Sequence, residues 1–281
     1  MRIRFSALQI DRKTPIVQNL MRVVQGGSFT KPSSEIKMKI CIIIPVYNHE
    51  HAIRQVIAKL KPYNIPCLLI NDGSSVACSA VLEDTVRQES GWLTLLNRVA
   101  NGGKGAAVID GFKVAKRLGY THALQIDADG QHNTDDIPRF LEAGRLNPHA
   151  MILGQPVFDE SVPKNRLYGR RVTNLWIAIN TLSLAIADGM CGFRLYPLAT
   201  VDKLISTTHI GLGMDYDIEI VVRLYWQGVE TINIPTAVSY PYDGVSHFRL
   251  WRDNVLISKA HARLFFGMLI RIPQLLLRHW R

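Results

Sequence analysis

The chain has 281 residues, of which 47% are hydrophobic, and it carries a formal net charge of +10 at pH 7. This length accommodates one large α/β domain or two small ones with a sizeable core, and the apolar content excludes wholesale disorder. The basic balance favours anionic partners, namely nucleic acid, anionic lipid headgroups or phosphorylated ligands.

The cysteines and the N-terminus bear on the compartment. Cys41, Cys67, Cys78 and Cys191 show no Cys-x-x-Cys spacing, and the first two lie in apolar runs, as reduced core residues do. The N-terminus lacks the apolar segment of a signal peptide. No uncharged apolar run reaches the roughly 18 residues of a spanning helix. We therefore expect a cytoplasmic protein without an ordinary transmembrane helix.

Composition divides the chain into three parts. Residues 1–38 contain the loop-forming stretch "QGGSFTKPSSE" and several basic residues, which predicts a mobile extension or, alternatively, a short basic helix near a membrane. Residues 39–248 are expected to form the main domain. Residues 249–281 are basic and amphipathic, which predicts a C-terminal helix.

From residue 39 onward, apolar runs alternate with segments of helical periodicity. Strands are predicted near residues 39–47, 66–72, 92–97, 121–127 and 150–157, and helices near 49–63, 76–90, 106–119 and 134–146. Continuous apolar runs are typical of strands buried on both faces. Strands that alternate with helices predict an α/β fold with a mostly parallel sheet.

Polar clusters follow the predicted strands at Tyr47–Asn48, Asn71–Asp72, Asn101–Lys104 and Asp127–Gln131. Open parallel sheets bind ligands at these carboxyl ends. Asp127 and Asp129 are spaced i, i+2 and can point the same way. With Gln131 they offer hard oxygen ligands that suit Mg²⁺ or Mn²⁺. The alternative is a solvated acidic turn.

The stretch "NGGKG" holds three glycines before and after Lys104. Such glycines allow backbone N–H groups to approach a phosphate, and Lys104 adds a positive charge. The spacing is not that of a Walker A loop. A plain flexible turn is the alternative.

The motifs "IIPVYN", "LLINDGSS", "NGGKGAAVIDG" and "LQIDADGQH" together resemble the family 2 glycosyltransferases of the GT-A fold. Among these, the chain is most similar to the dolichyl- or polyprenyl-phosphate hexosyltransferases, typified by dolichol-phosphate mannosyltransferase. The resemblance spans roughly residues 39–250. It implies nucleotide contacts at Pro45, Tyr47, Asn71 and Asp72, and a metal–diphosphate site at Asp127, Asp129 and Gln131. Where the family commonly has Glu and Asp, this chain has His49 and Asn71.

Two later segments extend the resemblance to the acceptor side. "DGMCGFRLYP" resembles the segment that shapes the sugar pocket, so Arg194 and the basic run Lys164, Arg166, Arg170 and Arg171 are candidates for an acceptor phosphate or the leaving diphosphate. "MDYDIEIVVRL" resembles the segment that carries the general base, which implies this role for Asp217, with Asp215 as a rival. The alternative is a structural role, in which both aspartates cap the following helix and interact favourably with its dipole.

These residues predict an inverting, metal-dependent transfer of a hexose from a nucleotide-diphosphate sugar, either a UDP-sugar or GDP-mannose. A metal held by Asp127 and Asp129 would stabilise the leaving diphosphate, a step for which Asp129 and Arg194 are further catalytic candidates. A hydroxyl acceptor needs a base such as Asp217, whereas a phosphate is already ionised.

The C-terminal segment suits an interfacial helix on anionic lipid, or alternatively a helix that packs on the domain or mediates oligomerisation. We therefore expect a peripheral enzyme at the cytoplasmic face of a membrane, with a polyprenyl phosphate or another lipid-linked or glycan acceptor. Two competing hypotheses are a sugar nucleotidyltransferase, which "PVYNHEHA" disfavours because it lacks glycine, and a non-catalytic membrane-docking protein. No nucleic-acid partner is expected, since no readout module is found.

Overall fold

The computed structural model describes residues 37–158, 162, 164–239 and 249–278, though not the side chains of residues 164–166. Residues Met38–Arg281 form one compact unit, to which everything below refers. Of the expected extension at residues 1–38, only Lys37 and Met38 belong to the described residues. The expected boundary after residue 248 falls at the end of the undescribed segment 240–248.

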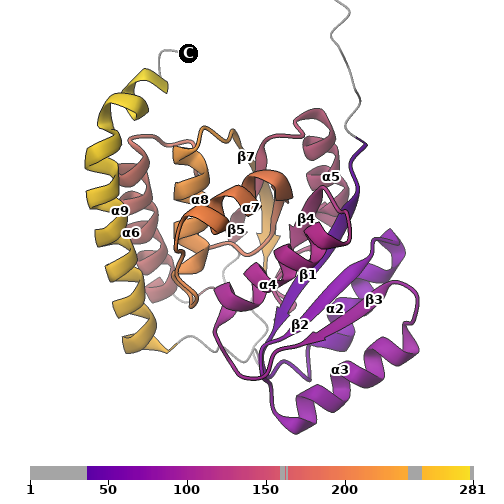
Figure 1. Cartoon of the computed structure of the whole chain (residues 1–281). Helices are drawn as coiled ribbons and strands as arrows, with labels where there is room; N and C mark the ends of the chain where they lie inside the picture. Colours follow the sequence, from indigo (N-terminus) through magenta and orange to yellow (C-terminus); the bar gives the residue numbers. More distant parts are fainter. Residues whose placement is uncertain (1–36, 159–161, 163, 240–248, 279–281) are drawn as a thin grey trace, which may run out of the picture. The chain divides into compact units, whose positions relative to one another are not determined.

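A seven-stranded sheet runs through the described part of this unit (Figure 1). The spatial order is β3 (Leu93–Asn97), β2 (Cys67–Asn71), β1 (Ile40–Val46), β4 (His122–Gln125), β6 (Arg194–Pro197), β5 (Met151–Phe158) and β7 (Thr231–Val238). β6 is antiparallel to both of its neighbours, and the other pairs are parallel. This confirms the predicted mostly parallel α/β sheet, while β6 and β7 are additions to the strands predicted above.

Helices cover both faces of the sheet. One face packs against α2 (Ile53–Leu60), α3 (Val76–Gln88) and α5 (Ile137–Leu146), and the other against α4 (Lys104–Arg117), α7 (Leu198–Thr207) and α8 (Tyr216–Trp226). Short 3₁₀ turns occupy Lys61–Tyr63 and Thr134–Asp136. Along β1, Ile42 and Ile44 enter one core cluster, whereas Cys41 and Ile43 enter the other. Burial on both faces is the reason why this strand reads as an unbroken apolar run.

Two long helices, α6 (Lys164–Thr181) and α9 (Leu250–Arg278), pack side by side at one end of the unit (Figure 1). α9 buries Ile257, Leu264, Met268 and Leu275 in the core cluster that it shares with α6 and α8. The predicted C-terminal helix is confirmed. One face of it packs on the domain, and the other face is exposed.

Candidate functional site

A cavity of about 680 Å³ opens at the carboxyl ends of β1, β2 and β4, the edge at which parallel sheets bind ligands. Most of the predicted site residues line it, namely Pro45, Tyr47, Asp72, Lys104, Asp127, Asp129, Gln131 and Asp217. Asn71 and Arg194 do not line it. The topology thus gathers into one space residues that are up to 172 positions apart, from Pro45 to Asp217.

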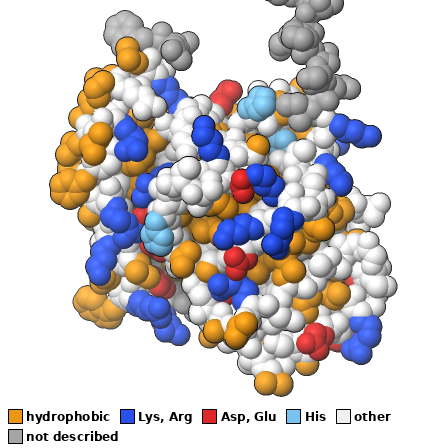
Figure 2. All heavy atoms as spheres, in the orientation of Figure 1, with side chains coloured by type: hydrophobic (Ala, Val, Ile, Leu, Met, Phe, Trp, Pro, Cys, Tyr) orange, Lys and Arg blue, Asp and Glu red, His pale blue; other side chains and the backbone are white. Residues whose placement is uncertain are grey.

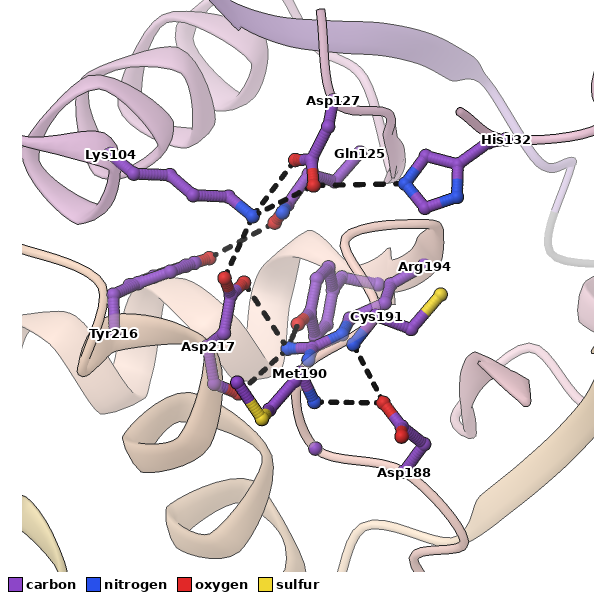
Figure 3. Close-up of polar contacts among 12 residues, drawn as sticks. Lys104, Gln125, Asp127, His132, Asp188, Met190, Cys191, Arg194, Tyr216 and Asp217 are labelled. Carbon is purple, nitrogen blue, oxygen red and sulfur yellow. Dashed lines mark hydrogen bonds and ion pairs between the residues drawn. The ribbon is translucent and has the colours of Figure 1, made fainter. Parts of the chain in front are cut away.

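Lys104, the first residue of α4, joins two carboxylates on different elements (Figure 3). Its Nζ lies 2.7 Å from Oδ2 of Asp217 and 2.9 Å from Oδ1 of Asp127. Burial by itself lowers the pKa of Lys104, but the charges of both carboxylates more than offset it and hold the pKa above its ordinary value. Lys104 is therefore a fixed cation in the cavity wall.

Glycines before and after Lys104 permit this close approach. Gly103 has φ +97°, and a Cβ there would lie 2.5 Å from the carbonyl oxygen of Leu212. A Cβ on Gly105 would lie 2.5 Å from the Cβ of Tyr216. The glycines thus allow α4 to contact the segment before α8, which carries Asp217.

Asp127 follows β4 and is enclosed on several sides (Figure 3). Nε2 of His132 lies 3.6 Å from its Oδ2, and a Cβ on Gly192 would come within 2.1 Å of the same oxygen. Burial raises the pKa of Asp127, but the charges of Lys104 and His132 outweigh it and hold the pKa well below its usual range. Burial lowers the pKa of His132, whereas Cys191 and Asp127 raise it to about 10. His132 is therefore a buried imidazolium at neutral pH.

Asp129 and Gln131 offer oxygen ligands on the same cavity wall. Oδ1 of Asp129 accepts a 3.0 Å hydrogen bond from the backbone N–H of Gln131, which fixes the loop. No group of three His, Cys, Asp or Glu side chains suited to a metal ion occurs in the described part of the chain. Mg²⁺ and Mn²⁺ commonly complete their coordination with water and phosphate oxygens. The donor set therefore fits a divalent ion shared with a diphosphate ligand, and not one held by protein alone.

Arg194 lies behind Asp217 and is fully buried on β6. Its Nη1 donates to the carbonyl oxygen of Asp217 at 2.8 Å and to the hydroxyl of Tyr196 at 2.9 Å. The same nitrogen lies 3.7 Å from Oδ1 of Asp217. Arg194 therefore positions Asp217 from inside the domain, and in this structure it does not reach the cavity.

Asp72 and Asn71, at the end of β2, organise the loops that border the cavity. Asp72 accepts hydrogen bonds from the backbone N–H groups of Gly102 (2.9 Å) and Gly103 (2.8 Å), and it is paired with Arg98. The side-chain amide of Asn71 donates to Asn97 and Ser79, and its oxygen accepts from the backbone of Ser74. Asp72 thus fixes the loop that contains Gly102 and Gly103, while the hydrogen bonds of Asn71 fix the end of β2.

The family is decided by comparison with known proteins. The model of the family "Glycosyl transferase family 2" matches residues 41–201, which carry all of the strand-end clusters. The chain belongs to this family. The residues described above are thus the candidate site of a family 2 glycosyltransferase.

Two relatives of this glycosyltransferase have names that refer to polyprenol or dolichyl phosphates. The polyprenol monophosphomannose synthase of Mycolicibacterium smegmatis is 24% identical over 79% of this chain and 85% of its own. The UDP-N-acetylglucosamine–dolichyl-phosphate N-acetylglucosaminyltransferase of Methanococcus voltae is 28% identical over 59% of this chain and 72% of its own.

A solved structure confirms the GT-A fold. The glucosyl-3-phosphoglycerate synthase of Mycobacterium tuberculosis, crystallised with Mn²⁺ and UDP-glucose, aligns with a TM-score of 0.60. The alignment covers 83% of this chain and 79% of that chain at 12% identity. At this identity the similarity concerns the fold.

Asp188 holds the segment of residues 188–197, for which an acceptor-side position was predicted. This buried carboxylate pairs with Arg170 of α6 at 2.5 and 2.8 Å and accepts from the backbone N–H groups of Met190 and Cys191. Arg170, Met190, Cys191 and Gly192 line the cavity. Of the other predicted basic residues, Arg171 is exposed, and the side chains of Lys164 and Arg166 lie outside the described part.

A second ion-pair cluster lies beside Asp217 and was not predicted from the sequence. Glu219 is buried, accepts from the backbone of Gly211 at 2.8 Å and pairs with Arg263 of α9 at 2.7 Å. Arg263 also lies 3.3 Å from Asp215, whose pKa is raised, first by burial and then by the charge of Glu219. Arg263 is 44 residues from Glu219, so no local sequence pattern indicates the pair.

Arginines of α9, and the arginine that directly precedes it, also line the cavity. Arg249, Arg252 and Arg263 line the cavity together with Leu256 and Ile257. This segment was predicted to form a membrane-surface helix and was not among the predicted site residues. A signal was available, because closely spaced arginines beside apolar residues are typical of phosphate recognition next to lipid.

Proposed function

We propose that the chain is an inverting, metal-dependent glycosyltransferase that moves a hexose from a UDP-sugar or GDP-mannose to a polyprenyl phosphate or another lipid-linked acceptor. The observation that carries this proposal is the composition of one cavity. Oxygen ligands from Asp127, Asp129 and Gln131 line it, and so do Arg249 and Arg252 from a distant part of the chain. Such a cavity can hold a diphosphate and an acceptor phosphate at the same time.

The donor half of the cavity lies over β1, β2 and β4. We propose that Pro45 and Tyr47 contact the nucleotide, with Asn71 and Asp72 shaping the loops around it. Asp127, Asp129 and Gln131 would hold Mg²⁺ or Mn²⁺ together with the diphosphate, and Lys104 lies beside them as a fixed cation. When bound, the metal supplies Lewis-acid stabilisation of the leaving diphosphate.

The surroundings of Asp217 favour an acceptor that is already ionised. Its carboxylate lies against Lys104 and 3.7 Å from Arg194. Asp217 is thus already paired with two cations inside the protein, so an acceptor that needs no base fits this site. A phosphate monoester is largely ionised near neutral pH, since its second pKa is about 6, and needs no base. Asp217 would serve as the base only for a hydroxyl acceptor.

Polyprenyl phosphate is an ionised acceptor of this kind, and the names of two relatives also support it. The synthase from M. smegmatis and the transferase from M. voltae are named for polyprenol and dolichyl phosphate. No described helix is long and apolar enough to cross a bilayer. We propose that the enzyme works as a peripheral protein at the cytoplasmic face of a membrane, with α9 at the lipid surface.

The proposal is tested by following labelled sugar into an organic extract. The full chain is incubated with Mn²⁺, with UDP-glucose, UDP-N-acetylglucosamine or GDP-mannose, and with either polyprenyl phosphate or polyprenol in detergent. We expect one donor to label polyprenyl phosphate and none to label the alcohol. Labelling of polyprenol alone, or of neither lipid with any donor, would contradict the proposed acceptor.

A further inference from the structure

Helix α6 carries an exposed apolar stripe. Tyr168, Val172, Leu175 and Trp176 have exposed fractions of 72%, 39%, 62% and 39%. Their spacing places them on one side of the helix, opposite the buried Thr173, Ile177 and Asn180. Large apolar side chains gathered on one exposed helix face mark an interaction surface.

Helix α9 carries a second stripe along its outer side. Its exposed large apolar residues include Val255, Phe266, Leu269, Ile270, Leu276 and Leu277. In the C-terminal half of α9, the arginines Arg271 and Arg278 pack against the domain. Arg271 packs over the ring of Trp226 at 4.7 Å and Arg278 over that of Tyr225 at 3.8 Å. The outer side of this half is therefore mainly apolar, and Figure 2 shows hydrophobic side chains along the α9 edge of the molecule, with Lys and Arg side chains among them.

Aromatic side chains connect the two stripes. The ring of Trp176 on α6 lies 6.2 Å from that of Phe265 on α9, which in turn lies 5.9 Å from that of Phe266. Trp176 and Phe266 are both exposed, and Phe265 is partly buried between them. The stripes therefore form one surface, which we call the α6–α9 face and define by Tyr168, Val172, Leu175, Trp176, Phe266 and Ile270.

The charges beside this face are of one sign. Arg171, Arg252 and Lys259 are exposed on the same two helices. The sole acidic residue in the sequences of α6 and α9 is Asp253, which is buried and accepts from the backbone N–H of Arg249. An apolar stripe flanked by Lys and Arg matches a bilayer that contains anionic lipid. Two copies of the face would bring like charges together, which disfavours a homodimer.

We propose that the α6–α9 face is a lipid-binding surface and that α6 inserts its stripe into an anionic bilayer beside α9. The orientation rests on the proposed function. The same two helices supply Arg170 and Arg252 to the cavity, Arg249 directly precedes α9, and next to them Trp251 is 83% exposed. A lipid phosphate in the membrane plane would therefore reach the cavity along these arginines, without leaving the surface that the stripes occupy.

Vesicle binding tests the assignment of α6. The full chain is sedimented with phosphatidylcholine vesicles that contain or lack phosphatidylglycerol, without acceptor lipid. Leu175→Glu on α6 and Ile270→Glu on α9 are compared with Val99→Glu, whose wild-type side chain is fully exposed in the loop after β3. We expect wild type and Val99→Glu to bind the anionic vesicles, and each of the other two variants to bind about tenfold more weakly.

Besides a failure of the wild type to bind vesicles, three results would overturn the inference. One is wild-type partitioning by Leu175→Glu, and another is equal weakening by Val99→Glu. The third is a wild-type dimer in sedimentation velocity that Leu175→Glu dissociates while vesicle binding stays unchanged. Calorimetry of donor binding without vesicles separates this inference from the proposed function. Protein that binds a sugar nucleotide but no vesicle refutes the lipid surface alone, whereas protein that binds vesicles but no sugar nucleotide refutes the function alone.

Discussion

At the scale of single residues, each buried carboxylate of the site has a cation beside it. Asp127 and Asp217 share Lys104, Asp188 has Arg170, and Glu219 has Arg263. Buried charges are costly to desolvate, so removal of one partner leaves the other uncompensated. Conservative changes to the cations should therefore affect stability as well as activity.

The free energy of unfolding is expected to fall at alkaline pH because of His132. Burial lowers its pKa, but Cys191 and Asp127 raise it to about 10, above the roughly 6.5 of an unfolded chain. A raised folded-state pKa contributes stability that is complete below about pH 6.5 and is lost as the pH rises through about 10. The midpoint of thermal unfolding should thus differ most between wild type and His132→Gln at pH 6, and the difference should shrink towards pH 10.5. The exposed His51→Gln is the control, and a gap that is constant with pH would refute the charged His132.

Gly192 is expected to tolerate no side chain. A Cβ there would lie 2.1 Å from Oδ2 of Asp127, so Gly192→Ala must displace the carboxylate. We expect a loss of about 1–3 kcal/mol in the free energy of unfolding and a fall of about a hundredfold in kcat, because misplacement by about 1 Å costs that much. Gly169→Ala on α6, where a Cβ meets nothing within 4 Å, is the control. Wild-type turnover by Gly192→Ala would contradict this geometry.

At the scale of elements, α9 is part of the site and not an appendage. Its Arg263 reaches Glu219 and Asp215 at the start of α8, and Glu219 in turn holds the backbone of Gly211. The loop of residues 209–215 borders the cavity from this side. Helix packing at the end of the chain thus fixes a cavity wall made by residues some 50 positions earlier.

Arg263 and Glu219 should be energetically coupled. Arg263→Gln leaves a buried carboxylate short of its partner, which costs about 2 kcal/mol once the partial exposure of Arg263 is allowed for. The exposed Lys259→Gln on the same helix should change stability little. Chemical denaturation of Arg263→Gln, Glu219→Gln and the double variant measures the coupling. Strict additivity of the two single changes would refute the pair.

At the scale of the whole molecule, the apolar runs predict most of the sheet. β1, β2 and β4 lie where residues 39–47, 66–72 and 121–127 indicate them, because strands buried on both faces contain few polar residues. The strand-end clusters also meet in one cavity as predicted, because parallel strands end at a common edge.

The sequence does not indicate which strands pair over long range or which distant side chains form ion pairs. β6 is four residues long and antiparallel within a parallel sheet, and its Arg194 is fully buried where an acceptor contact was expected. Arg263 of α9 is a second case, because its partners Asp215 and Glu219 lie at the start of α8. Residue type predicts charge and ligand chemistry, whereas the partner of each charge depends on the packed fold.

The proposed function requires that the cavity bind a sugar nucleotide together with a divalent metal. Isothermal calorimetry of UDP- and GDP-sugars, with Mn²⁺ or with excess chelator, tests it most directly. One nucleotide class should bind to wild type and to Asp202→Ala, a control far along the chain on α7, and should lose at least about tenfold in affinity on metal removal or in Asp129→Ala. Equal binding with and without Mn²⁺ and in Asp129→Ala, or no binding by the folded protein, would contradict the proposed metal–diphosphate site.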